Sequence, residues 1–134
     1  MINQTRQSRQ KQTAEVFTPP ELTNEILDKL PSEIWESEKI FLDPSCGNGN
    51  ILLEVFKRKL FYKHEPLQAL KTLYGVDLMP DNIEELKERF LELLEPSLHS
   101  EALKIMNHNF ICHDALTWDF INWKDNTKKF KKLF

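Results

Sequence analysis

The segment from Asp43 to Asn50, Asp-Pro-Ser-Cys-Gly-Asn-Gly-Asn, has the residue types needed to bind a ligand through the backbone. Gly47 and Gly49 permit positive φ angles and have no Cβ atom to keep a ligand away from the main chain. The segment lies between an expected strand and an expected helix, which makes the two glycines more informative than in an arbitrary turn. Leu52 stands where the dinucleotide fingerprint has its third glycine, which disfavours a nicotinamide or flavin cofactor.

Two further aspartates, Asp77 and Asp114, follow short apolar runs like the run that ends at Asp43. A carboxylate at a strand end can accept hydrogen bonds from both hydroxyl groups of a ribose, and we expect this role for Asp77. Asp114 could accept a hydrogen bond from the amino group of an adenine ring. The competing interpretation is that each aspartate only caps the turn or helix after it, but three aspartates at matching positions favour a shared ligand.

These aspartates are expected to end three strands, at residues 39–43, 73–77 and 110–114. Apolar residues at helical spacing predict helices at about residues 19–30, 51–60, 66–71, 80–94 and 97–106. Strands that alternate with helices predict βαβ units, a parallel sheet and right-handed crossovers. The three carboxylates then lie at the carboxyl edge of the sheet, where open α/β sheets bind ligands.

The first of these helices has a predicted start and end. Thr18 is expected to cap it, with Pro19 in the first turn and Glu21 completing a capping box. Its apolar residues Leu22, Ile26, Leu27 and Leu30 recur at helical spacing, and Pro31 ends the pattern.

Four segments together resemble the amino-methyltransferases that modify adenine in DNA. They are AEVFTPP (14–20), FLDPSCGNGN (41–50), LYGVDLMPDN (73–82) and ICHDAL (111–116), which resemble motifs X, I, II and III of that family. The order of the motifs matches the subgroup whose target-recognition region lies at the C-terminal end. The resemblance covers nearly the whole chain from Ala14 to Leu116.

The resemblance implies S-adenosylmethionine as the cofactor. Phe17, Thr18 and Pro19 would close over its methionine end. Asp43, with the backbone of Gly47 and Gly49, would hold its amino-acid part, and Pro44 and Cys46 of the same segment are also counted as cofactor-binding residues. Cys46 is interpreted as a small packing residue, because amino methylation needs no covalent intermediate.

The adenosine end of the cofactor is assigned in the same way. Asp77 would bind the ribose, Leu78 would pack on the adenine ring, and Asp114 with Ala115 would read the amino edge of that ring. The implied fold belongs to the α/β class. It is a partial Rossmann-like methyltransferase fold, a three-stranded parallel sheet with flanking helices that lacks the C-terminal strands.

The catalytic loop of such enzymes, an Asp/Asn-Pro-Pro-aromatic tetrapeptide that contacts the flipped base, is missing from this sequence. Its only Pro-Pro pair, Pro19-Pro20, stands between Thr18 and Glu21. No catalytic residue is therefore assigned. In a 3-2-1-4-5 strand order the first strand would be left as an exposed edge, which predicts a truncated or split protein.

The leading functional hypothesis is accordingly the cofactor-binding N-terminal part of an adenine-specific DNA methyltransferase. DNA would bind through a missing downstream region, and the remaining strands and the catalytic loop would come either from the lost part of a truncated or split gene or from a second chain. The alternatives are a non-catalytic cofactor-binding subunit with a regulatory or decoy role, and a methyltransferase for RNA or protein. No metal and no membrane partner are expected.

The bulk composition is that of one globular domain and excludes a basic DNA-coating protein. The chain has 134 residues, 40% of them hydrophobic and 29% charged, with a net charge of -3. Its two cysteines form no disulfide framework, and it has no secretory leader or membrane-spanning run, which favours a cytoplasmic location. We expect a basic arm at residues 1–14, the methyltransferase part at 15–123 and a basic tail at 124–134.

Overall fold

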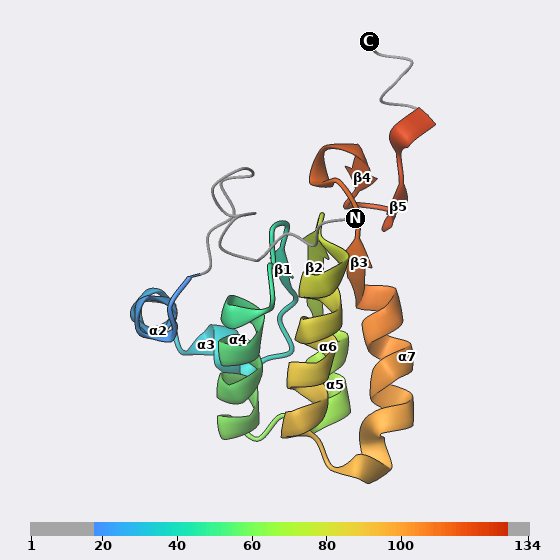
Figure 1. Ribbon diagram of the computed structural model, residues 1–134. Coiled ribbons are helices and arrows are strands. Elements are labelled where there is room, and N and C mark those ends of the chain that lie inside the picture. The colour runs from blue at the N-terminus through green and yellow to red at the C-terminus, as the bar shows by residue number, and fades with distance from the viewer. Residues whose placement is uncertain (1–17, 129–134) are drawn as a thin grey trace.

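The computed structural model describes residues 18–128, and Figure 1 shows three parallel strands with helices against them. The sheet has the order β1-β2-β3. Its elements and their connections are β1 (Phe41–Asp43), α4 (Asn50–Phe61), α5 (Pro66–Lys71), β2 (Leu73–Asp77), α6 (Pro80–Leu93), a 3-10 turn (Pro96–Leu98), α7 (His99–Asn109) and β3 (Phe110–Cys112). The predicted α/β class and the flanked parallel sheet are confirmed, as in a partial Rossmann-like fold.

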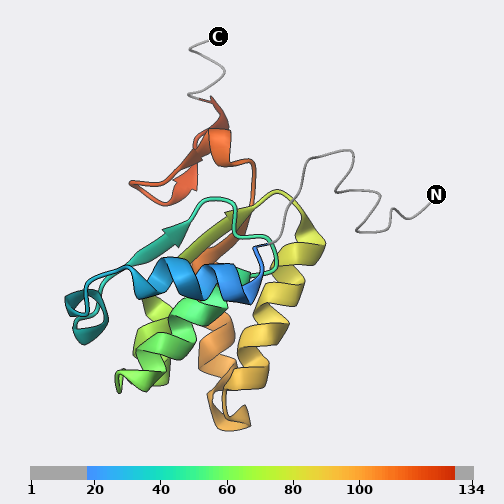
Figure 2. The ribbon, with the colours of Figure 1, turned by 90° about the vertical axis from the view of Figure 1, so that its left-hand side faces the viewer.

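The core lies between the sheet and the helices α4 and α6. Phe90 of α6 stacks on Phe110 of β3 with ring centroids 5.3 Å apart, and it meets Phe56 of α4 edge-on at 5.2 Å. All three rings are almost completely buried. Figure 2 shows α4 and α6 on the same side of the sheet, so this face holds the turn between β1 and α4 in place.

The helix α2 (Pro20–Asp28) starts differently from the prediction. Pro19 is its extended N-cap, and no side chain caps the helix, so the predicted capping box of Thr18 and Glu21 is wrong. The reason is that the helix begins at Pro20, which needs no N–H partner, and this removes Glu21 from the third helical position. The carbonyl of Pro19 instead accepts the first helical bond, from the Thr23 N–H.

The buried side of α2 is narrower than its apolar pattern suggests. Leu27 is buried together with Thr23, whereas Leu22 and Ile26 are about half exposed. The helix lies against α4, and part of this contact is polar because Arg58 of α4 donates to the carbonyl and side chain of Asn24. A short helix, α3 (Glu33–Glu36), leads from α2 to β1 and buries Trp35.

The observed bounds of the elements agree with the predicted bounds in the middle of the chain and differ at the first and third strands. Residues 66–71 and 73–77 form α5 and β2 as predicted. β1 is shorter than predicted, and β3 ends at Cys112, so Asp114 is not at a strand end. The cause is the length of β2, whose last residue Asp77 pairs with Cys112.

A small antiparallel hairpin that the sequence did not indicate follows β3. It consists of β4 (Trp118–Asp119) and β5 (Lys124–Asp125), and Figure 1 shows it beyond the carboxyl ends of the strands. The Trp123 ring meets Tyr74 of β2 edge-on at 4.9 Å, and its Nε1–H donates to the His108 carbonyl at 2.6 Å. These two contacts anchor the hairpin to β2 of the sheet and to the end of α7. No helix among residues 18–128 is both long and apolar enough to cross a membrane.

Candidate functional site

The turn between β1 and α4 has a backbone that only glycine adopts easily. Gly47 has a φ of 55° and Gly49 a φ of 92°. A Cβ atom on Gly49 would lie 2.0 Å from Cδ1 of Leu86, a buried residue of α6. The turn therefore combines positive φ angles with close contact to a helix, which explains both glycines of the Gly-Asn-Gly sequence.

Cys46 fixes this turn against the neighbouring strand. Its N–H donates to the Val76 carbonyl of β2 at 3.0 Å, and its side chain is buried. A Cβ atom on Gly75 would come within 2.9 Å of the Cys46 Sγ, so the sulfur occupies the space above Gly75. Burial, followed by the nearby carboxylates of Asp43 and Asp77, raises the pKa of the thiol. Such a thiol is neutral and acts as a packing group.

Two carboxylates from neighbouring strands converge on the turn. Asp77 Oδ1 accepts the N–H of Gly47 at 3.1 Å. Its Oδ2 accepts the Met79 N–H at 3.0 Å and the Nδ2–H of the buried Asn82 at 2.9 Å. The Asp77 carboxylate is thus held in one orientation by donors on both of its oxygens.

Asp43, at the end of β1, is the second of these carboxylates. Its Oδ1 accepts the Ser45 N–H at 3.1 Å. Burial raises the pKa of Asp43, the Ser45 hydrogen bond lowers it, and the negative charge of Asp77 raises it further. A nearby cationic group on a ligand would lower the pKa of Asp43 through its charge and so oppose the effects of burial and of Asp77.

A small pocket of about 20 Å³ lies beside these groups. It is lined by Thr18, Asp43, Ser45, Cys46, Gly47, Asn48, Asn50 and Ile51. Within the described residues the buried Oδ1 of Asn48 has no hydrogen-bond partner, although its amide nitrogen donates to Glu85 at 3.3 Å. A pocket of this size holds about one water molecule or one charged group, and the free acceptor suits a donor such as an ammonium group.

The structure brings some of the predicted residues together and separates others. Thr18, Asp43, Cys46 and Gly47 line the pocket, and Asp77 is bonded to Gly47. Gly49 shapes the turn on the side that faces Leu86 of α6. Pro19 and Pro44 are exposed neighbours of residues that line the pocket. Phe17 lies outside the described residues, as do the expected arm 1–14 and most of the basic tail.

The predicted adenine contacts lie further along the same edge. Leu78 is exposed after the end of β2. The Asp114 carboxylate accepts the Leu116 N–H at 2.9 Å and caps the short turn that contains Ala115. The chain after β3 stays close to β2, because the His113 N–H donates to the Asp77 carbonyl at 2.9 Å. Asp114 therefore has the turn-capping role that the sequence left as an alternative, at a position next to the proposed ligand edge.

Sequence reasoning missed three polar residues around the turn, Asn48, Asn50 and Arg89. Arg89 of α6 donates through Nη1 to the Asn48 carbonyl at 3.0 Å and to Asn50 Oδ1 at 2.7 Å. The asparagines had a visible signal, since they alternate with the two glycines. Arg89 had none, because an arginine on an amphipathic helix looks like an ordinary solvated residue.

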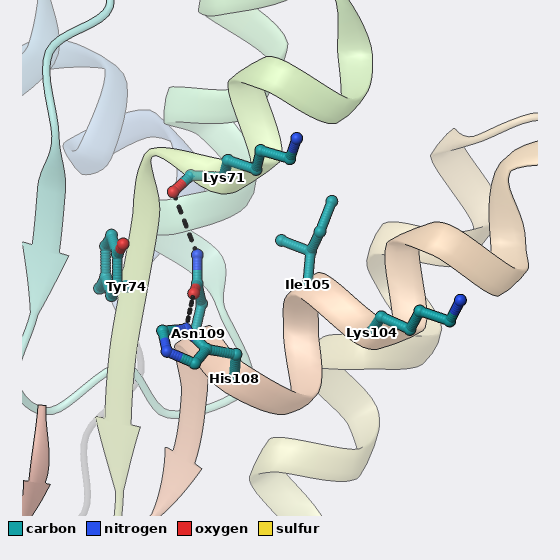
Figure 3. Close-up of a pocket in the computed structure, with 6 residues that line it drawn as sticks. All are labelled: Lys71, Tyr74, Lys104, Ile105, His108 and Asn109. Atoms are coloured by element: carbon teal, nitrogen blue, oxygen red, sulfur yellow. Dashed lines mark hydrogen bonds between the residues drawn. The ribbon is translucent and has the colours of Figure 1, made fainter.

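A larger hollow of about 380 Å³ lies elsewhere, between β2 and the helices α5 and α7 (Figure 3). Its central polar residue, Asn109, donates to the carbonyls of Lys71 and Leu73, and its Oδ1 accepts from Nδ1 of His108 at 2.7 Å. Figure 3 shows the ammonium groups of Lys71 and Lys104 pointing away from Asn109. These contacts join helix ends to the sheet. Residues 18–128 contain no cluster of three metal-ligating side chains at this hollow or anywhere else.

Comparison with known proteins points to one family. The sequence profile of the N-6 DNA methylases matches residues 1–87. The Type II methyltransferase M.VspI of Vibrio sp. (strain 343) is 35% identical over 77 residues. That match covers 58% of this chain and 16% of the Vibrio protein, so the chain corresponds to a small part of its relative.

Proposed function

Because this chain belongs to the N-6 DNA methylase family, we propose that it binds S-adenosylmethionine at the carboxyl ends of β1 and β2. The proposed activity of the protein to which this site contributes is methylation of the exocyclic amino group of adenine in DNA. The observation that carries the proposal is the convergence of Asp43 and Asp77 on the glycine turn, with a hydrogen bond from the Gly47 N–H to Asp77. This edge is where open α/β sheets bind ligands.

The hydrogen-bond acceptors of the pocket fit the ammonium group at the amino-acid end of the cofactor. The Asp43 carboxylate and Asn48 Oδ1 are both acceptors, as an ammonium group requires. Because the pocket holds only a small group, the remainder of the ligand would lie over the exposed strand ends, with its ribose at Asp77 and its adenine on Leu78. When bound, the cofactor supplies a methyl group activated by a sulfonium.

The residues of this chain would bind and orient the cofactor. We assign none of them to the methyl transfer itself, because the sequence contains no Asp/Asn-Pro-Pro-aromatic tetrapeptide. The groups that contact the target adenine of the DNA would then come from other segments or from a partner chain. We propose the same origin for most of the other DNA contacts.

Calorimetric titration with S-adenosylhomocysteine, the demethylated product of the cofactor, tests this site. We expect Asp77→Ala to weaken binding by about 10- to 100-fold, the usual effect of losing hydrogen bonds to a charged group. Glu88→Ala, a change at an exposed carboxylate on α6, is the matched control and should bind as the wild type does. If the wild-type chain bound no S-adenosylhomocysteine, or if both variants bound it equally well, the proposed site would be wrong.

A further inference from the structure

Asn50, the first residue of α4, bridges two segments whose relative position shapes the proposed cofactor site. Its Nδ2–H donates to the Thr18 carbonyl at 2.9 Å, and its Oδ1 accepts the Nη1–H of Arg89 at 2.7 Å. Thr18 precedes α2, Asn50 begins α4 and Arg89 belongs to α6. One amide side chain thus connects three elements that lie far apart in the sequence.

The chemistry of the two partners fixes the orientation of this amide. A guanidinium group can only donate, so it must face the oxygen of Asn50, and a backbone carbonyl can only accept, so it must face the nitrogen. Arg89 also donates to the Asn48 carbonyl at 3.0 Å, which ties the same guanidinium to the glycine turn. Thr18 is therefore held relative to the backbone that would contact the ligand.

Thr18 and Asn50 both line the small pocket that contains Asp43. We propose that Asn50 is a positioning residue that sets the wall formed by Thr18 over the amino-acid end of the cofactor, and that Arg89 holds Asn50 in the required orientation. This inference rests on the proposed cofactor site and deepens it. The resemblance already implies that Thr18 lies at the amino-acid end, and the inference adds the two residues that hold it there, separately from the Asp77 position that would bind the ribose.

The substitution Asn50→Asp tests the bridge with almost no change in shape. The carboxylate still accepts from Arg89, but it presents an oxygen to the Thr18 carbonyl and so replaces a hydrogen bond by a repulsion. Because the added negative charge attracts the ammonium group of the ligand and repels its carboxylate, Asn50→Ala, which removes the bridge without adding a charge, is measured beside it. Asn107→Asp is the matched control, because Asn107 is an exposed residue of α7 whose Oδ1 accepts from Lys87.

Two ligands separate the ends of the site. S-adenosylhomocysteine contains the amino-acid chain, whereas 5′-methylthioadenosine retains the adenosine and lacks that chain. We expect Asn50→Asp to weaken binding of S-adenosylhomocysteine by about tenfold or more and to leave binding of 5′-methylthioadenosine unchanged. Asp77→Ala should weaken both, and Asn107→Asp should weaken neither. Arg89→Met, which frees the amide to rotate, should give a smaller loss for S-adenosylhomocysteine only.

Calorimetry on the full chain distinguishes the possible failures. If the wild type binds both ligands and Asn50→Asp weakens both equally or neither, the positioning role is wrong and the cofactor site stands. If the wild type binds neither ligand, the proposed function is wrong, and the positioning role falls with it. Thermal unfolding checks that the variant is folded. If Asn50→Asp does not fold, Asn50→Ala removes the bridge without adding a charge and is judged by the same comparison.

Discussion

At the scale of single residues, Asp43 combines a proposed binding role with a cost to the fold. It lies at the end of β1, where burial and the charge of Asp77 disfavour its ionised form and raise its pKa. The Ser45 N–H opposes this shift but does not outweigh it. A carboxylate whose ionised form is destabilised in the free protein is well suited to bind a cationic group, because the positive charge of the ligand then stabilises the ionised form.

The variant Asp43→Asn should therefore be more stable than the wild type and bind the cofactor less well. Since the folded-state pKa of Asp43 is raised, the folded wild type binds more protons than the unfolded chain just above pH 3.8, and its stability falls as pH rises through that window. The asparagine cannot ionise but can still accept from Ser45. The difference in unfolding free energy between Asp43→Asn and the wild type should vanish below pH 3.8. It should grow as the pH rises to the raised pKa of Asp43 in the folded protein and stay constant above that pKa.

Denaturant unfolding of both proteins from pH 3 to pH 8 measures this difference. Asp119→Asn, a change at a half-buried carboxylate of β4, serves as a control, because hydrogen bonds from Asn122 lower the pKa of Asp119 and give the wild-type residue the opposite pH dependence. Equal stability of Asp43→Asn and the wild type at neutral pH would contradict the argument. So would tighter binding of S-adenosylhomocysteine by the variant.

At the scale of elements, the turn between β1 and α4 is fixed by α6 as much as by its own sequence. Leu86 leaves no room for a side chain at Gly49, whose φ of 92° already disfavours one. Gly49→Ala should destabilise the protein by about 1–3 kcal/mol, the usual cost of a non-glycine residue in such a conformation. Thermal unfolding of Gly49→Ala, Leu86→Ala and the double variant measures the steric share of this cost. The double variant should lose less than the two single changes together, and strict additivity would show that Leu86 is not involved.

How well the elements could be predicted depended on whether their causes were local. Residues 66–71 and 73–77 were predicted with their observed bounds, because Pro66 opens one and an apolar run defines the other. The hairpin at residues 118–125 was missed because Trp123 packs on Tyr74, a residue distant in sequence. Asp114 was misplaced because the end of β3 is set by the end of β2.

The candidate site shows the same division. The glycine turn, Asp43 and Asp77 were recognised from residue types and spacing within single segments. The capping box at Thr18 was wrong, since the Thr18 carbonyl is bound by Asn50 and the helix starts after it. No pattern within α6 could show that Arg89 holds Asn50, because that contact exists only once α4 and α6 lie side by side.

At the scale of the whole molecule, the helices α4 and α6 cover one face of the sheet, and the other face is partly apolar and open. A hollow of about 250 Å³ on this open face is lined by Ile40, Leu42, Tyr74, His108, Phe120, Ile121 and Trp123. Ile40 is 69% exposed and Ile121 is 94% exposed. Next to them, β1 is one of the two edge strands of the described sheet, and edge strands beside apolar surface favour association between copies of a chain.

The double variant Ile40→Lys/Ile121→Lys should therefore self-associate less than the wild type while keeping its stability. Two like charges at the rim of the hollow repel a second copy, and both side chains are too exposed to contribute much to the core. Sedimentation velocity over a range of protein concentrations measures the association, and thermal unfolding measures the stability. Leu116→Lys is the matched control, because Leu116 is 76% exposed but does not line the hollow. A wild-type chain that sediments as a monomer at every concentration would show that this face does not drive self-association.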